Sequence, residues 1–173
     1  MILSGNEIIK NIGTNIIIEP FLQENINPNS YNLRLHNELM IYEDDILDAS
    51  KQNKTKKILI PDDGYVLQPG QLYLGRSLEY TETHGFVPVL QGRSSMGRLG
   101  VTVHITAGFG DVGFCGYWTM QLTCIKPTKI YPQMKICQIY YQTILGEFEE
   151  YDSKKYQNSS SIQASRIYEE LKR

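Results

Sequence analysis

The chain has 173 residues, and 17 Lys and Arg against 19 Asp and Glu give it a formal net charge of −2. Its 41% hydrophobic and 21% charged residues exclude a disordered or fibrous protein. No stretch approaches the roughly 18 apolar residues of a membrane span, and the near-neutral charge argues against coating of nucleic acid. We expect a single domain over residues 1–173 that is soluble and cytoplasmic, lacks a secretory signal, and binds neither membrane nor nucleic acid.

A short helix is predicted near the N-terminus. Ser4 and Glu7 have the spacing of a capping box, and apolar residues follow on one side, so we expect a helix over about Ser4–Asn11. The basic run Lys51–Lys57 offers charge for a phosphate. Because a charge run between strands is more commonly a solvated loop, we interpret it as one.

The middle of the chain has the pattern of antiparallel strands. From Tyr31 to Thr143, short apolar or alternating runs are separated by turn signals such as Asp62-Asp63-Gly64 and Pro69-Gly70. Helical periodicity is nearly absent there. The segment therefore predicts a mainly β fold.

The first candidate binding segment is Gly92–Gly100, GRSSMGRLG. Its two arginines, adjacent hydroxyls and glycines could converge on an anion, phosphate above all. The spacing matches neither a P-loop nor a dinucleotide fingerprint. A tight turn with two surface arginines is the alternative interpretation.

A second glycine-rich segment, Thr106–Gly116, surrounds a single acid, Asp111. Its four glycines allow the backbone to approach a ligand closely, and the carboxylate could bind a sugar hydroxyl or orient water. Aspartate in such a hairpin is also a common turn former, so both readings stay open.

Two runs alternate most clearly between apolar and polar residues. Each predicts a strand with one polar face, and two such faces directed at the same region would line a pocket. Ordinary solvent-exposed faces are the alternative. The apolar sets are Val101, Val103, Ile105 and Trp118, Met120, Leu122, and the polar sets are Thr102, His104, Thr106 and Thr119, Gln121, Thr123.

The three cysteines, Cys115, Cys124 and Cys137, form no C-x-x-C pair. We therefore expect neither a disulfide framework nor a thiolate zinc site, and we interpret the cysteines as small core residues. Residues 150–173 are expected to form a C-terminal lid or tail, in which Ser159–Ser161 is flexible and the final SRIYEELKR is either a short helix or a mobile tail.

The sequence GRSSMGRLGVTVHITAGFGDVGFCGYW resembles the central signature of the dCTP deaminases, a branch of the dUTPase-like superfamily. The resemblance extends to LSGNEI, INPNSYNLRL, LQPGQLYLGRSLEYT, ICQIYY and KYQN, and so covers most of the chain. It implies a distorted antiparallel β-barrel or jelly roll, assembled as a homotrimer with active sites between subunits. It also implies conversion of dCTP to dUTP and ammonia, without zinc, and Mg²⁺ bound mainly through the triphosphate of dCTP, dUTP or dTTP.

The resemblance also assigns roles to individual residues. It places Arg93, Ser94, Ser95 and Arg98 on the triphosphate and the catalytic water, with Ser94 and Arg98 also assisting catalysis. Further substrate-binding or catalytic positions are Ala107, whose carbonyl would hold the water, Asp111 on the deoxyribose hydroxyl, Trp118, Thr119 and Gln121 on the cytosine edge, and Lys155 and Tyr156 over the phosphates. Ser159 stands where the family usually has glutamine, so the lid matches less closely.

The larger departure is at Gln121, where the family has a glutamate that deprotonates the attacking water. An amide cannot accept that proton, so the resemblance implies impaired deamination with substrate binding retained, in a natural or engineered variant. Some relatives also cleave dUTP to dUMP and pyrophosphate, and the TAGF stretch resembles those bifunctional members. A dUTPase and a catalytically inactive dCTP- or dUTP-binding regulatory protein are the alternatives.

Overall fold

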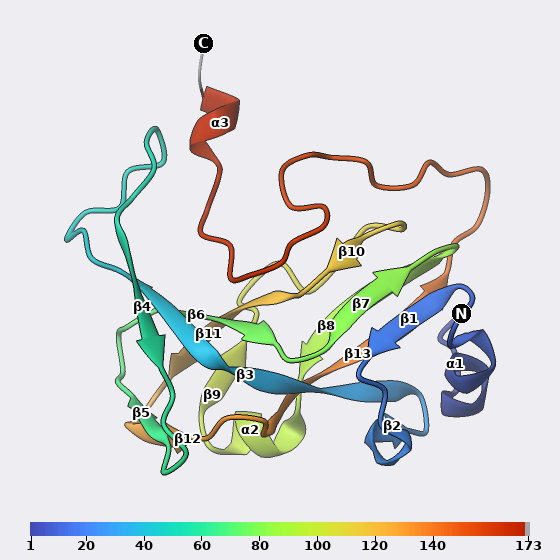
Figure 1. Ribbon diagram of the computed structural model, residues 1–173, viewed down its shortest axis with the longest axis horizontal. Helices are drawn as coiled ribbons and strands as arrows, with labels where there is room; N and C mark the ends of the chain where they lie inside the picture. The colour runs from blue at the N-terminus through green and yellow to red at the C-terminus, as the bar shows by residue number, and fades with distance from the viewer. Residues whose placement is uncertain (172–173) are drawn as a thin grey trace.

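The computed structural model describes residues 1–171 and consists mainly of antiparallel strands (Figure 1). This confirms the predicted mainly β fold. Within residues 1–171, the helices are all too short or too polar to cross a membrane. The elements are α1 Gly5–Asn11, β1 Ile16–Glu19, a 3₁₀ turn Gln23–Asn25, β2 Ile26–Asn27, β3 Ser30–Tyr42, β4 Thr55–Leu59, β5 Tyr65–Leu67, β6 Tyr73–Ser77, β7 Tyr80–Thr83, β8 Phe86–Gly92, α2 Ser94–Arg98, β9 Val101–Val103, β10 Cys115–Gly116, β11 Thr119–Cys124, β12 Thr128–Ile130, β13 Lys135–Thr143 and α3 Tyr168–Leu171.

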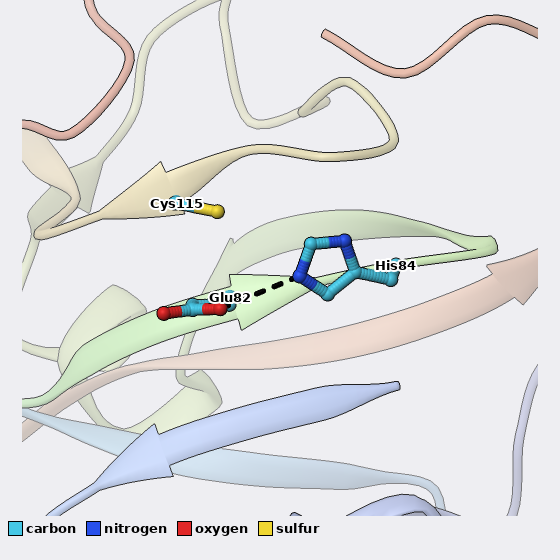
Figure 2. A group of neighbouring side chains, drawn as sticks. All are labelled: Glu82, His84 and Cys115. Carbon is cyan, nitrogen blue, oxygen red and sulfur yellow. Dashed lines mark hydrogen bonds and ion pairs between the residues drawn. The ribbon is translucent and has the colours of Figure 1, made fainter. Parts of the chain in front are cut away.

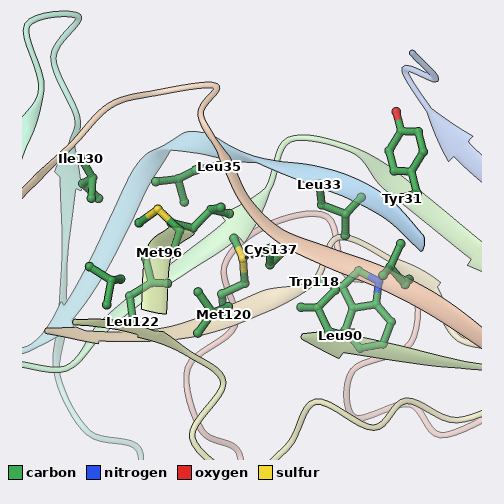
Figure 3. Close-up of a cluster of buried hydrophobic side chains, with 14 of the residues drawn as sticks. Tyr31, Leu33, Leu35, Leu90, Met96, Trp118, Met120, Leu122, Ile130 and Cys137 are labelled. Atoms are coloured by element: carbon green, nitrogen blue, oxygen red, sulfur yellow. Dashed lines mark hydrogen bonds between the residues drawn. The ribbon is translucent and has the colours of Figure 1, made fainter. Parts of the chain in front are cut away.

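The largest sheet has the strand order β8-β13-β3-β6-β11-β9, with β2 and β4 also paired to β3. A smaller sheet has the order β1-β7-β10, and β12 pairs with β5. Because the large sheet curves nearly into a barrel, its inward side chains meet in one core (Figure 3). The jelly-roll or barrel prediction from the sequence is therefore confirmed.

Side-chain alternation fills the core. In β11 the buried Met120, Leu122 and Cys124 alternate with partly exposed residues, as the sequence predicts. In β3, Leu33 and Leu35 face the same core. Complete burial of one such side chain stabilises the fold by about 1.5 to 3 kcal/mol, so the alternating pattern fixes which face of each strand turns inward.

The N-terminal helix forms as predicted. Ser4 is the N-cap of α1, and its hydroxyl accepts a hydrogen bond from the Glu7 N–H over 3.2 Å. Ile8 is fully buried and attaches the helix to the core. The predicted turns also form, with Gly64 and Gly70 at positive φ values of 94° and 77°.

Two predictions about the strands need correction, the first because it was wrong and the second because it was right only in part. Ile105 was expected on the apolar face of its strand, but it is 60% exposed because β9 ends at Val103 and His104 adopts a φ of 56°. The run Lys51–Lys57 is not a loop throughout. Its last three residues belong to β4, which pairs with the long strand β3 and thereby satisfies its backbone polar groups.

The C-terminal segment, residues 144–171, crosses the barrel after β13 (Figure 1). Ser159 was predicted to be flexible, but it is buried, and its carbonyl accepts a hydrogen bond from the Tyr117 N–H over 2.9 Å. Ile162 packs against Met40 and Leu74 in a small cluster of its own. The final residues form the short helix α3 up to Leu171, and residues 172 and 173 lie outside the described part.

The cysteines follow the prediction only in part. Cys124 and Cys137 are buried in the core, but Cys115 is partly exposed on β10. All three are free thiols. Cys115 differs because β10 lies at the edge of the small sheet and not inside the barrel.

Candidate active site

A cavity of about 460 Å³ lies between the end of the barrel and the C-terminal segment. Aromatic and aliphatic side chains form most of its wall, and a few polar groups point into it, which is the usual composition of a small-molecule site. The residues that line it are Tyr42, Leu72, Leu74, His104, Ala107, Phe109, Gly110, Asp111, Phe114, Tyr117, Trp118, Thr119, Gln121, Tyr151, Tyr156, Ser159, Gln163, Ala164 and Ser165.

Strand β11 places Thr119 and Gln121 on the cavity face, because residues two apart on a strand share a side. The Thr119 hydroxyl accepts a hydrogen bond from the backbone N–H of Gln163 over 3.0 Å. The C-terminal segment is thereby attached directly to the strand that forms the cavity floor. The pocket that alternation predicted is present in part, because His104, Thr119 and Gln121 line it. The other three residues of the predicted polar faces, Thr102, Thr106 and Thr123, are not in the described lining.

Gln121 is paired with His104. The distance from His104 Nδ1 to Gln121 Oε1 is 2.8 Å. With the amide in this orientation, its oxygen can only accept, so Nδ1 carries the proton. Nε2 is buried and has no hydrogen-bond partner among the described residues. Burial lowers the pKa of His104, partly opposed by the hydrogen bond to Gln121, so the imidazole is neutral at pH 7.

The glycine-rich segment between β9 and β10 brings Ala107 and Asp111 to the cavity. Asp111 is exposed and also borders a second, smaller hollow of about 340 Å³. The glycines serve packing within the protein more than approach to a ligand. A Cβ on Gly108 would lie 2.3 Å from the Leu90 carbonyl oxygen, and one on Gly110 would lie 2.4 Å from the Trp118 ring.

Trp118 forms a rigid part of the wall. It is 7% exposed, and its indole N–H donates to Thr81 Oγ1 over 2.9 Å. Since the only polar atom of the ring is thereby used, Trp118 offers a ligand an apolar surface and no side-chain hydrogen bond.

Of the two predicted lid residues, only Tyr156 reaches the cavity. The Tyr156 hydroxyl accepts a hydrogen bond from the Arg166 N–H over 3.0 Å, which fixes the ring. Lys155 is absent from the lining formed by residues 1–171 and instead pairs with Glu170, with its ammonium 5.4 Å from the centre of the Tyr156 ring.

The predicted phosphate-binding residues lie elsewhere. Ser94, Ser95 and Arg98 are exposed on α2, and the described lining of the cavity includes neither them nor Arg93. Arg93 donates to the Lys135 carbonyl over 2.8 Å. In Figure 1, α2 lies on the side of the barrel opposite the C-terminal segment. One chain therefore does not bring the two groups of predicted site residues together.

Several lining residues were missing from the predicted site. His104 carried a signal, because alternation had placed it on the same polar face as Thr102 and Thr106. Tyr42 and Gln163 carried none, since they come from distant parts of the chain and meet the cavity only after folding. Among residues 1–171, the one cluster of three metal-ligating side chains lies outside this cavity.

Comparison with known proteins gives a consistent result. Residues 2–144 match the family model described as dCTP deaminase-like. The chain is 60% identical over 173 residues to the "dCTP deaminase, dUMP-forming" of Clostridium beijerinckii, with complete coverage of both chains. It is also 54% identical to the protein of the same description from Cytophaga hutchinsonii, over 100% of this chain.

The fold also resembles a solved structure, the 2'-deoxycytidine 5'-triphosphate deaminase from Agrobacterium tumefaciens. The TM-score is 0.65 at 17% sequence identity, with 81% of this chain and 47% of that chain aligned. The present chain thus spans about half the length of that one. At this identity, the likeness supports a shared fold only.

Proposed function

Because the chain belongs to the dCTP deaminase-like family, we propose that it is a dCTP-binding enzyme of the dUMP-forming type. In this reaction, water replaces the amine of dCTP to give dUTP and ammonia, and a second water then cleaves dUTP to dUMP and pyrophosphate. Support comes from the full-length relatives, which carry the description "dCTP deaminase, dUMP-forming". The observation that carries the proposal is the cavity in which β11 presents Thr119 and Gln121 beside Ala107 and Asp111.

The cavity suggests how a pyrimidine nucleotide would lie. The base would face Thr119 and Gln121, whose hydroxyl and amide match the polar edge of cytosine, and would rest against the apolar face of Trp118. Ala107 would hold the attacking water through its carbonyl, and Asp111 would accept a hydrogen bond from the sugar hydroxyl. Tyr156 would lie over the ligand as part of the C-terminal segment.

The phosphates require a second subunit in this proposal. Arg93, Ser94, Ser95 and Arg98 provide the positive charge and hydroxyls suited to a triphosphate, but they lie away from the cavity of their own chain. A homotrimer in which α2 of one subunit faces the cavity of the next would complete each site. Light scattering of the purified protein should give three times the chain mass, and a monomer that binds dCTP would contradict this arrangement.

Mg²⁺ would enter with the triphosphate. Its ligands would be mainly the phosphate oxygens, because Mg²⁺ prefers oxygen ligands and commonly binds through substrate phosphates. The cavity offers one imidazole and no thiolate among its described lining, so its donors do not match a zinc set. We therefore assign deamination to side chains and water. As a separate part of the proposal, we place the protein in the cytoplasm, where nucleotide metabolism takes place.

Gln121 is expected to affect the two steps differently, slowing deamination of dCTP but not cleavage of dUTP. Its amide can hydrogen-bond the base but cannot take a proton from water, so the proposal includes slow deamination with intact nucleotide binding. Cleavage of dUTP needs no carboxylate at this position, and Asp111 is available to activate the second water. A dUTPase is therefore the second candidate, and an inactive nucleotide-binding regulator is the third.

Product analysis separates these functions. The purified chain is incubated with dCTP or with dUTP, in the presence of Mg²⁺, and ammonia and pyrophosphate are measured separately. Ammonia from dCTP supports the deaminase, whereas pyrophosphate from dUTP alone supports the dUTPase. Saturable binding of dCTP by calorimetry, with neither product, supports the binding protein, and absence of both binding and products contradicts all three.

A further inference from the structure

Three metal-ligating side chains meet on the small sheet, away from the candidate active site. The ligand atoms of Glu82, His84 and Cys115 all lie within 4.8 Å of one another. Figure 2 shows Glu82 on β7, His84 just beyond the end of that strand, and Cys115 on the neighbouring strand β10. Each side chain is partly exposed, so the group is accessible from solvent.

The sheet register explains how the cluster forms. Cys115 of β10 is directly paired with Glu82 of β7, and directly opposed residues of antiparallel strands project from the same face. His84 follows two residues after Glu82 and so returns to that face. The cysteine spacing argued against a thiolate zinc site, but spacing along the chain contains no information about this pairing.

A fourth residue orients the histidine. His84 Nε2 lies 3.4 Å from Glu82 Oε2, and His84 Nδ1 lies 3.3 Å from the Glu150 carboxylate. This is the arrangement found around metal-bound histidines, in which one ring nitrogen binds the ion and the other donates to a carboxylate. The Tyr80 hydroxyl donates to Glu82 over 2.9 Å and fixes the remaining carboxylate.

The charges of the cluster are unbalanced without a cation. Glu82 and Glu150 converge on the single imidazole of His84, and neither carboxylate forms an ion pair with a lysine or arginine of residues 1–171. A divalent ion adds two positive charges and the ionised Cys115 thiol adds one negative charge, so binding would reduce the negative charge of the group by one.

We propose that Glu82, His84 and Cys115 bind a divalent ion of the zinc class, with Glu150 as the carboxylate that orients His84. A thiolate and an imidazole select Zn²⁺ and its neighbours over Mg²⁺ and Ca²⁺, which prefer oxygen ligands. Tetrahedral bonds of about 2.0 to 2.3 Å require the ligand atoms to approach to roughly 3.3 to 3.8 Å. Since Glu82 and His84 are 32% and 36% exposed, their side chains can close this distance. Binding releases the thiol proton to solvent, and water takes the fourth position.

The site is independent of the proposed nucleotide chemistry but lies next to the C-terminal segment. Glu150 directly precedes Tyr151, the first residue of that segment in the cavity lining. The Cys115 N–H also donates a hydrogen bond to Gln157 Oε1 of the segment over 2.9 Å. The Gly113 Cα is so close to Glu150 that an added Cβ would lie 2.6 Å from the Glu150 Cβ. A bound ion would therefore link β7 to β10 directly, and would link both to the start of the segment through the contact between His84 and Glu150.

Cobalt tests the proposal directly, because Zn²⁺ has no visible spectrum and Co²⁺ occupies similar sites. Reduced, nucleotide-free protein is titrated with Co²⁺, and a thiolate-to-cobalt charge-transfer band is expected that Zn²⁺ displaces. Cys115→Ser should abolish the band, whereas the control Cys124→Ser should retain it. His84→Gln should weaken Zn²⁺ binding by at least about 100-fold and Glu150→Gln by about 10- to 100-fold, whereas His36→Gln, beside Glu38, should leave it unchanged.

A second measurement needs no variant. Alkylation of the unmodified chain followed by mass spectrometry should show that Zn²⁺ slows modification of Cys115 without changing the rates at Cys124 and Cys137. Absence of the cobalt band, a band that survives Cys115→Ser, or an alkylation rate at Cys115 that Zn²⁺ does not change would each overturn the proposal. Neither measurement depends on dCTP or dUTP, so their results stand apart from the proposed function.

Discussion

Replacing Gln121 by glutamate tests the proposed chemistry most sharply. Gln121→Glu changes one amide to a carboxylate of nearly the same shape, in a cavity where His104 already donates to it over 2.8 Å. A hydrogen bond to a charged group contributes about 1.5 to 3 kcal/mol, compared with about 0.5 to 1.5 kcal/mol for a neutral one. The stronger hydrogen bond raises the pKa of His104 and lowers the pKa of the new carboxyl group.

This coupling opposes the effect of burial and keeps the new carboxylate ionised at neutral pH, where it can accept a proton from water. General-base catalysis contributes at least about 100-fold, equivalent to about 2.7 kcal/mol of the barrier, so ammonia release from dCTP should rise by at least that factor. The affinity for dCTP should change by less than about tenfold, because the contacts of the base are preserved.

The assay measures ammonia from dCTP with the parent chain and with Gln121→Glu, and calorimetry supplies the dCTP affinities. Gln121→Ala is the control, since it removes the contact without adding a base and should give no ammonia. Proton NMR of the three histidines should show the expected rise in the His104 pKa. If Gln121→Glu binds dCTP, shows this rise and still releases no ammonia, the assignment of β11 to the deamination step is refuted.

Three further predictions concern the phosphates, pH and the core. Arg98→Ala should weaken dCTP binding by about 1.5 to 3 kcal/mol, the range for hydrogen bonds to charged groups, but should leave deoxycytidine binding nearly unchanged, and equal losses in calorimetry would assign the arginine a structural role. The pKa of His104 is lowered by burial from its usual 6.5, so the native state binds fewer protons than the unfolded state below that pH. The free energy of unfolding in urea should therefore fall as the pH drops from 6.5 toward the lowered value, and His104→Gln should reduce this fall. Met120→Ala should cost about 2 to 5 kcal/mol, because Met120 is fully buried in the core, and a loss below about 1 kcal/mol would contradict that packing.

Local patterns predicted the local structure well. The capping box at Ser4 gave the start of α1, and alternation gave the inward face of β11, because both signals lie within a few residues and depend on nearest neighbours. The Ile105 prediction failed for a related reason. A period of two was extended past His104, whose positive φ ends the strand.

Residue patterns pointed to the site where its parts lie on one strand or in one glycine-rich segment, as with Gln121 and Asp111, and both line the cavity. Tyr156 lies far from both along the chain and was predicted only from the family resemblance. Tyr42 and Gln163 were missed because tertiary folding brings them there from opposite ends of the chain. The pairing of Cys115 with Glu82 was missed for the same reason, since sheet register is set by packing of the entire small sheet.

The position of the C-terminal segment has a consequence for the order in which the protein is made. The last strand, β13, ends at Thr143, so every strand of the barrel is synthesised before residues 144–171. The barrel can therefore fold first, with the surface of Met40 and Leu74 uncovered until Ile162 is released. Chains cut short by stalled translation would keep that surface open and would lack Tyr151, Tyr156 and Gln163 in the cavity wall. The wall of the pocket is therefore assembled only after residues 151–165 have joined the barrel.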